Sequence, residues 1–245
     1  MKIPWLSKAR ISKTASSLMA DYDSRMGFSV TPPIPVEDII ERHLGLTLSF
    51  DDLEEKLGMP DVLGATYVRS RRIVVNERLL EERYEGRLVF TFAHEVGHWV
   101  LHRAYAEAAA RRGRASEIIV CRAGCAKEPI EWQADYFAAC LLIPEAAVIR
   151  AFDAAYGTDA LVLHNAQQTL GRPGLGCIEP CAENWPFLAA MVCEIGGFTN
   201  VSKQAMIIRL QDLGLLVNAS GAPLGWRKSD AQLHPANTVS ASRPF

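Results

Sequence analysis

The feature that most constrains this chain is a His-Glu-x-x-His pattern inside an apolar stretch with helical periodicity. Residues 87–102 read RLVFTFAHEVGHWVLH, and we predict a helix over them. Four residues turn a helix about 40° past one revolution, so His94 and His98 project from one face and both imidazoles can bind one ion. Glu95 points along the neighbouring side, where its carboxylate can reach a water beside that ion. The pattern predicts a metal site on this helix, with Glu95 as the general base.

A second helix, predicted over 130–142, offers the remaining ligand. Glu131 and Asp135 are four residues apart and therefore share a helix face. A catalytic zinc needs a third protein ligand and an open position for water, and Glu131 can supply the carboxylate. Asp135 is placed to accept the second ring N–H of a ligating histidine. The two residues could instead be an exposed acidic pair, but their neighbours are apolar, and carboxylates are rarely buried without a partner.

His102 extends the histidine series but is not expected to bind the ion. On a straight helix it lies about 12 Å along the axis from His94. We therefore interpret it as a helix-end residue or as a neighbour of a ligand. Possible donors to the oxyanion of a cleaved peptide bond are Tyr67, Tyr136 and His164, and the pattern does not select among them. The strand near residues 65–68 could pair with an extended substrate, if it lies at a sheet edge.

The rest of the chain predicts an α+β fold of helices around a small, hairpin-based sheet. The segments GATYV (64–68) and RIVVN (72–76) predict the hairpin, and LTLSF (46–50) predicts another strand. Residues 103–128, rich in alanine and arginine, are interpreted as a surface excursion. Further helices are predicted over 7–26, 36–43, 145–156, 186–195 and 202–213. We divide the chain into a metal-binding domain (1–156), a helical segment (157–218) and a disordered tail (219–245).

Charge and composition narrow the class of protein. The chain has 245 residues, is 49% apolar, and carries a formal net charge of −2 at pH 7. A strongly basic nucleic-acid binder is therefore not expected. No stretch reaches the roughly 18 apolar residues of a membrane span, and the N-terminus lacks the apolar core of a secretory signal. These features predict a globular cytoplasmic protein that does not contact a membrane.

Six cysteines in such a protein are expected to be reduced thiols. Two pairs have Cys-x-x-x-Cys spacing, Cys121 with Cys125 and Cys177 with Cys181. Structural zinc more often uses a two-residue spacer, so a second, structural zinc is not favoured. Free thiols are the favoured interpretation, and a reversible thiol lock on the catalytic zinc by Cys121 or Cys125 is the remaining alternative.

Residues 186–214 have the pattern of a helix, a Gly-Gly turn and a second helix, which resembles a helix-turn-helix. A DNA-reading second helix should present several basic or amide side chains. The candidates are Lys203, Gln204, Arg209 and Gln211, with Asp212 opposing them. A packing element or a substrate-docking surface is favoured over a DNA reader.

These motifs together resemble the ImmA/IrrE family of zinc metallopeptidases. The matching stretches are PPIPVEDIIERHLGLTLSF, the LGATYV…RRIVVN hairpin, GRLVFTFAHEVGHWVLH, EWQADYFAACLLIP and FTNVSKQAMIIRLQDLGLL, which together cover roughly residues 30–217. The resemblance implies a zincin-like fold in which a small twisted sheet packs on the active-site helices. It also implies His94, His98 and Glu131 as zinc ligands and Glu95 as the general base.

The expected function is that of a zinc-dependent endopeptidase. The resemblance implies regulatory proteolysis, in which members cleave a partner helix-turn-helix transcriptional repressor, often in phage, mobile-element or stress-response settings. The alternative is a DNA-binding or protein-docking regulator with a structural zinc site. Glu95 argues against that alternative, because a structural site has no use for a general base. A latent protease that awaits a partner or metal is a third, weaker interpretation.

Overall fold

The centre of the fold is a four-stranded sheet with the strand order β1-β3-β2-β4. A computed structural model describes residues 3–81, 85–113, 117–123, 128–164, 181–222 and 224. Strand β1 (Thr47–Asp51) runs parallel to β3 (Arg72–Asn76). Strand β2 (Val62–Tyr67) is antiparallel to both β3 and β4 (Ile118–Arg122). The predicted hairpin is thus present, and it occupies the middle of the sheet.

The predicted edge position of residues 65–68 is wrong. Strand β2 is paired on both sides, so most of this stretch has no free side for a substrate. The edge strands among the described residues are β1 and β4. Strand β4 lies within 103–128, together with helix α5 (Arg103–Arg111), so that segment is not the simple surface excursion predicted for it. The five residues of β4 alternate between half-buried and buried, as expected for an edge strand that covers a helix.

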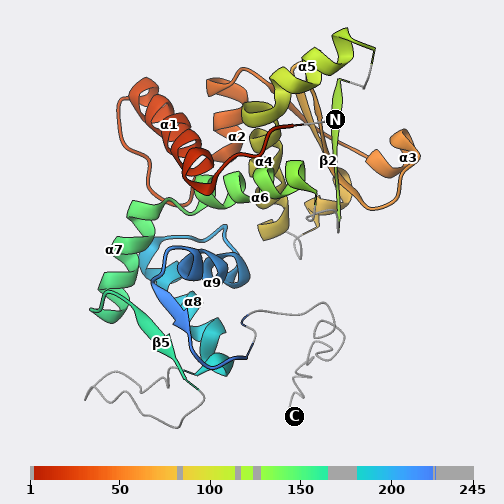
Figure 1. Ribbon diagram of the computed structural model, residues 1–245. Helices are drawn as coiled ribbons and strands as arrows, with labels where there is room; N and C mark the ends of the chain where they lie inside the picture. The colour runs from red at the N-terminus through yellow and green to blue at the C-terminus, as the bar shows by residue number, and fades with distance from the viewer. Residues whose placement is uncertain are drawn as a thin grey trace, which may run out of the picture.

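Two helices cross closely beside this sheet. Helix α4 (Glu85–Gly97) contacts β2 and β3, and α6 (Pro129–Leu142) packs on α4 (Figure 1). At the crossing, a Cβ on Gly97 would lie only 3.1 Å from the Cα of Ala134 and 3.2 Å from its carbonyl oxygen. The missing side chain therefore lets the two backbones approach, which brings the metal-binding motifs of both helices together.

The predicted helix over 87–102 is α-helical up to Gly97 and π-helical after it. Helix α4 stops at Gly97, and residues His98–His102 form a π-helical turn, η4, before α5 begins. A similar π-helical turn, η1 (Ile39–His43), follows α2 (Val36–Asp38) where a single helix was predicted over 36–43. Short helices that the sequence pattern did not indicate are α3 (Leu53–Leu57), η2 (Glu77–Leu80) and η5 (Ala182–Asn184).

Helix α1 (Lys8–Met26) covers the face of α6 that points away from the sheet (Figure 1). It starts at the N-cap Ser7, whose hydroxyl accepts from the backbone N–H of Arg10, and it stops at Gly27 in the left-handed region. Its buried residues recur every three to four positions, as in an amphipathic helix that packs on one side: Ile11, Ala15, Leu18 and Tyr22.

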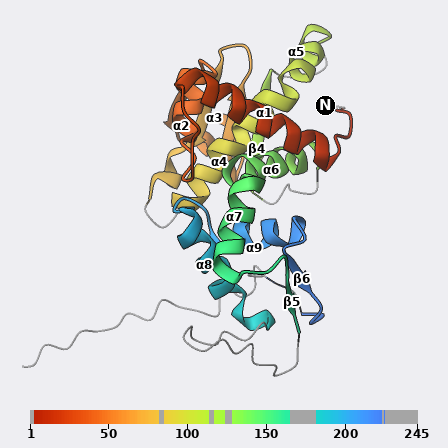
Figure 2. The same ribbon diagram turned by 90° about the vertical axis from the view of Figure 1, so that its left-hand side faces the viewer.

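The C-terminal helices continue the same core. Helix α7 (Glu145–Tyr156) packs on α8 (Trp185–Gly196), and α8 packs on α9 (Lys203–Asp212), as Figure 2 shows. Strands β5 (Leu161–Leu163) and β6 (Leu216–Asn218) form a separate parallel pair that was not predicted. Arg209 of α9 donates to the carbonyl oxygen of Ile143 at 3.2 Å, which ties α9 to the end of α6.

The overall class is α+β, as predicted. No helix among the described residues has the length and apolar character needed to cross a membrane. Most of the predicted disordered tail, 219–245, lies outside the described residues, as do Cys125 and Cys177.

Candidate metal centre

Three side chains converge between α4, η4 and α6. His94 Nε2 lies 2.9 Å from His98 Nε2 and 3.3 Å from Glu131 Oε2, and His98 Nε2 lies 3.3 Å from Glu131 Oε1. All three residues are buried. The structure therefore brings together the three residues that the sequence predicted as ligands, with two nitrogens and a carboxylate facing one point.

The separations of these atoms fit a tetrahedral ion. With bonds of about 2.0–2.1 Å, the ligand atoms of a tetrahedral zinc are about 3.3–3.4 Å apart. The two nitrogen–oxygen distances of 3.3 Å already match this value, and the pair of imidazole nitrogens needs to open by less than half an ångström. Two imidazoles and one carboxylate are a donor set that suits zinc.

Helix α6 presents Glu131 to the histidines from its first turn. Pro129 occupies the first turn of this helix, where its missing N–H costs nothing, and Glu131 follows two residues later. A carboxylate near a helix N-terminus is favoured by the partial positive charge of the unpaired N–H groups. Burial alone would raise the pKa of Glu131, but hydrogen bonds from His94 and His98 outweigh it and lower the pKa to about 2. The carboxylate is therefore ionised and able to bind a cation.

Asp135 holds His94 from the second ring nitrogen. Its Oδ1 lies 2.8 Å from His94 Nδ1, which is the contact predicted from the spacing of Glu131 and Asp135. A proton on Nδ1 leaves Nε2 free to bind an ion, so this contact fixes the tautomer that a metal ligand requires. Burial opposes the charged form of His94, yet the hydrogen bonds that its ring donates to Asp135, Cys121 and Glu131 raise its pKa well above the usual value. A metal must therefore displace a proton when it binds His94.

A chain of buried contacts holds the second histidine. His98 Nδ1 lies 3.0 Å from His102 Nδ1, and His102 Nε2 lies 3.2 Å from Gln133 Oε1. The amide nitrogen of Gln133 donates to the carbonyl oxygen of Pro4 at 3.1 Å. An amide oxygen only accepts, so we assign the His102 proton to Nε2, which leaves its Nδ1 to accept from His98 Nδ1–H. With the His98 proton on Nδ1, its Nε2 is the nitrogen that can bind an ion.

His102 lies beside a ligand, which is one of the two positions expected for it. It is four residues from His98, a spacing that brings side chains together on a helix face, and the two Nδ1 atoms are within hydrogen-bonding distance across the π-helical turn over His98–His102. Burial lowers the pKa of both His98 and His102 to about 4, so both rings are neutral at pH 7. His102 belongs to neither group of potential metal ligands found among the described residues.

The strands contribute the environment of Glu95. Thr66 Oγ1 donates to Glu95 Oε2 at 2.6 Å, and Gly64, two residues earlier on the same strand face, leaves space for the carboxylate. Glu95 Oε1 is buried and has no hydrogen-bond partner among the described residues. Burial raises the pKa of Glu95 to about 7, against the opposing effects of His94 and Thr66. Near neutral pH this carboxylate can therefore both accept and release a proton.

The three predicted oxyanion donors lie elsewhere. Tyr67 points to the opposite sheet face from Thr66 and packs beside Ala65 and Val74 under α3. The Tyr136 hydroxyl donates to Asp212 at 2.8 Å. His164 follows β5 and is exposed. Among the described residues, no hydrogen bond or ion pair joins any of the three to Glu95 or to the ligands.

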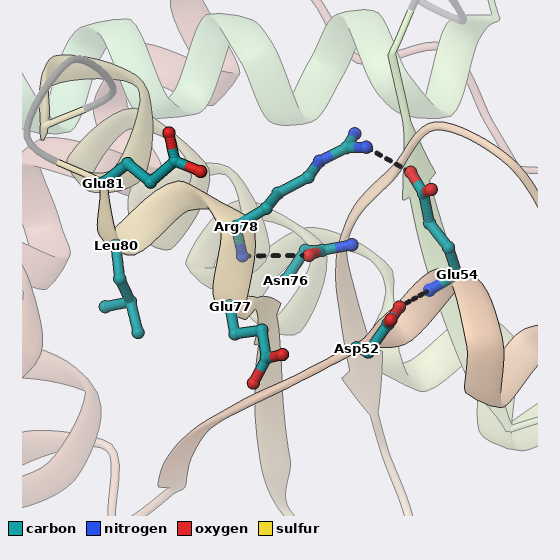
Figure 3. Close-up of a pocket in the computed structure, with 7 residues that line it drawn as sticks. All are labelled: Asp52, Glu54, Asn76, Glu77, Arg78, Leu80 and Glu81. Carbon is teal, nitrogen blue, oxygen red and sulfur yellow. Dashed lines mark hydrogen bonds and ion pairs between the residues drawn. The ribbon is translucent and has the colours of Figure 1, made fainter.

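Other parts of the surface do not resemble the metal centre. A hollow at the ends of β1 and β3 is lined mainly by acidic side chains, and Arg78 there pairs with Glu54 (Figure 3). It contains none of the three ligands.

On α9, Arg209 is buried and binds Ile143 and Asp212, so it cannot read DNA from this position. This weakens the helix-turn-helix interpretation of the segment.

Thr66, Gly64 and Gln133 were not predicted as parts of the site. Thr66 and Gly64 could have been suspected, because residues two apart on a strand share a face. Cys121 was considered for a second, structural zinc and for a thiol lock on the catalytic zinc, neither of which was favoured, and its orientation depends on the pairing of β4 with β2, which no local pattern gives.

The comparison with protein families gives one match. The family model described as Peptidase_M78, IrrE N-terminal-like domain, matches residues 47–171. This range contains both helices that carry the three ligands, all four strands of the sheet and Glu95. A comparison with curated proteins finds no match to the chain.

Proposed function

The chain belongs to the Peptidase M78 family through its IrrE N-terminal-like domain, and from this premise we propose that it is a zinc-dependent endopeptidase. The match confirms the resemblance to the ImmA/IrrE metallopeptidases and the zincin-like α+β class. The chain is accordingly a metallopeptidase. Three parts are our proposal: that the metal is zinc, that the enzyme cleaves within a chain rather than at its ends, and which substrate it cleaves.

The observation that carries the proposal is the position of Glu95 beside the ligands. Its Oε1 is buried and without a partner among the described residues, while Thr66 holds Oε2. A site that only stabilises a fold has no use for such a carboxylate. His94, His98 and Glu131 would hold the ion, and three protein ligands leave one position for a reactant, as in catalytic zinc sites.

In the proposed mechanism, Glu95 carries out the proton transfers and its neighbours hold it and the ligands in place. When bound, zinc supplies Lewis-acid chemistry by polarising a carbonyl and acidifying water. Glu95 Oε1 takes a proton from the attacking water and later donates it to the leaving amine nitrogen. Thr66 keeps the other carboxylate oxygen in place during both transfers. Asp135 keeps His94 in its binding tautomer, and His102 does the same for His98.

We place the substrate along β4. Among the described residues this strand pairs with β2 alone, and Cys121 on it lies beside His94 and Glu95. An extended peptide could pair with the other edge of β4 around Cys121, which would put a peptide bond near the ligands. N-methylation of backbone amides around the cleaved bond should raise KM, and an unchanged KM would count against this placement.

The substrate we propose is a partner helix-turn-helix repressor, cleaved in regulatory proteolysis. The support is the resemblance to ImmA/IrrE members. A net charge of −2 and the buried Arg209 also make direct DNA binding by this chain the weaker alternative. The regulator interpretation with a structural zinc would be favoured instead if the output of the chain did not depend on Glu95.

The test combines metal content with cleavage. Elemental mass spectrometry should find about one zinc in the wild type, and His94→Ala and Glu131→Gln should lose it. The matched controls His43→Ala and Glu145→Gln, outside the site, should keep it. Glu95→Gln should keep zinc but no longer cleave helix-turn-helix repressors of the source genome that the wild type cleaves, as judged from new termini by mass spectrometry. Cleavage by Glu95→Gln, or no zinc in the wild type, would refute the proposal.

A further inference from the structure

Cys121 lies on the sheet face that covers the metal centre. In the pairing of β2 with β4, Cys121 is opposite Gly64, and Ile119 is opposite Thr66. Gly64 and Thr66 face Glu95, so Cys121 faces the same way. The thiol is free, and the residue is only 6% exposed. Its side chain therefore points into the interior, toward the residues of the catalytic motif.

The ligand atoms of Cys121, His94 and Glu95 all lie within 4.8 Å of one another. This Cys121 cluster shares His94 with the group formed by His94, His98 and Glu131. It also contains Glu95, which is fully buried and whose Oε1 has no hydrogen-bond partner among the described residues. The thiol thus lies beside one ligand, His94, and beside the general base, and it would have to move toward His98 and Glu131 to share their ion.

A second buried cysteine shows that this placement is not a general property of the chain's thiols. Cys140 on α6 is also 6% exposed and also free. It belongs to neither of the potential metal-binding groups found among the described residues. Two thiols of equal exposure therefore differ in their surroundings, since only Cys121 lies against a metal ligand.

We propose that Cys121 is a fourth protein ligand of the metal, and that it closes the site in a resting form of the enzyme. This inference rests on the proposed zinc peptidase function. The S–H bond breaks, a sulfur–metal bond forms, and the proton passes to the carboxylate of Glu95. A metal deprotonates a thiol that coordinates it, and thiolate is a strong zinc ligand. The resulting set has two nitrogens, one oxygen and one sulfur.

The resting form would be latent. Zinc sites with four protein ligands are typical of structural sites, whereas catalytic sites keep one position for water. For hydrolysis, the sulfur–metal bond must break, and the thiolate must take back its proton from Glu95. The same proton transfer that releases the thiol leaves Glu95 ionised and ready to act as a base.

X-ray absorption at the zinc edge tests the inference on the full chain. Zinc–sulfur bonds are about 2.3 Å long, against about 2.0–2.1 Å for bonds to imidazole nitrogen, so one sulfur is resolved from the lighter ligands. We expect one sulfur at zinc in the wild type and in the matched control Cys140→Ser. We expect none in Cys121→Ser, with about one zinc bound in all three proteins. Cobalt substitution gives an independent readout, because the thiolate-to-cobalt absorption band should be lost only in Cys121→Ser.

The possible outcomes separate this inference from the function on which it rests. Wild-type zinc bound by nitrogen and oxygen alone would overturn the role of Cys121 and leave the peptidase proposal intact. A sulfur that persists in Cys121→Ser would assign the bond to another cysteine and also overturn it. Failure of the wild type to bind zinc would overturn both. If Cys121→Ser does not fold, a wild-type spectrum without sulfur still overturns the inference, and Cys121→Ala takes the place of Cys121→Ser in assigning a sulfur that is seen.

Discussion

Replacing His102 with phenylalanine should weaken zinc binding by about 10- to 100-fold, although His102 does not bind the ion. His98 Nδ1–H is buried and has His102 Nδ1, at 3.0 Å, as its acceptor. Phenylalanine has a ring of similar shape but no acceptor. The variant therefore leaves a fully buried N–H group of a metal ligand without a partner and no longer specifies which ring nitrogen carries the proton.

The magnitude follows from the cost of that unpaired group. A buried donor without a partner costs about 1–3 kcal/mol, and each 1.4 kcal/mol is a tenfold change in an equilibrium constant. Without metal, His98 can avoid this cost by shifting its proton to Nε2, but zinc binding requires Nε2 to be free. The cost therefore falls mainly on the metal-bound state. Loss of partners that hold metal ligands typically weakens metal binding by about the same 10- to 100-fold.

The assay is a competition for zinc between the chain and a chromophoric chelator at pH 7. His102→Asn is the conservative variant, because its side-chain oxygen can accept from His98 and should restore most of the affinity. His43→Phe, the same substitution outside the site, should leave affinity unchanged. Thermal unfolding of the metal-free proteins checks that the variants fold. If His102→Phe binds zinc within about threefold of wild type, the chain of contacts does not position His98 and the reasoning is refuted.

Two further predictions concern Glu95. In Gly64→Ala the new Cβ would lie 2.5 Å from Glu95 Oε1, so the carboxylate must retreat by about 0.9 Å to reach the 3.4 Å of ordinary contact. The rate of cleavage should therefore fall about a hundredfold, with zinc content unchanged. The control Gly86→Ala, where the new Cβ makes ordinary contacts only, should keep the wild-type kcat. In the metal-free chain, burial raises the pKa of Glu95 from 4.5 to about 7, so the stabilisation by its protonated form is complete below pH 4.5 and lost as the pH rises through 7. Metal-free Glu95→Gln should therefore match wild type near pH 4.5 and exceed its stability by roughly 3 kcal/mol at pH 8. Urea unfolding in the presence of a chelator measures this difference, and a gap that does not widen with pH would contradict it.

The parts of the site that could be predicted from the sequence are those set by local geometry. His94 and His98 share a helix face because they are four residues apart, and the same spacing relates Glu131 to Asp135. The close crossing of α4 and α6 could not be predicted from the spacing of the ligands, although Gly97, a residue inside the motif, permits it. Gly97 has no side chain, and Ala134 lies against it at the crossing point.

The failures arise where a position depends on a partner far away in the sequence. His102, expected at the helix end or beside a ligand, does lie beside the ligand His98, but its contact with Gln133 of α6 was not predicted. The apolar residues of β4 number only a few and follow a long arginine- and alanine-rich stretch, so their alternation was not apparent. Without β4 the hairpin looked like an edge, and neither the inward face of Cys121 nor the substrate edge could be located.

The helices and the sheet contribute different parts of the site. The helices carry the ligands and the general base, and their motifs can be read from the sequence. The sheet determines the position and the hydrogen bonds of the Glu95 carboxylate. Gly64 makes room for it, Thr66 donates a hydrogen bond to Oε2, and Oε1 has no hydrogen-bond partner among the described residues. A chain could therefore keep His-Glu-x-x-His and its distant glutamate intact, bind zinc, and still lose catalysis through a single side chain added to β2. In this protein, residues 64 and 66 decide reactivity as much as the motif does, because a carboxylate acts as a base only when its surroundings set both its position and its pKa.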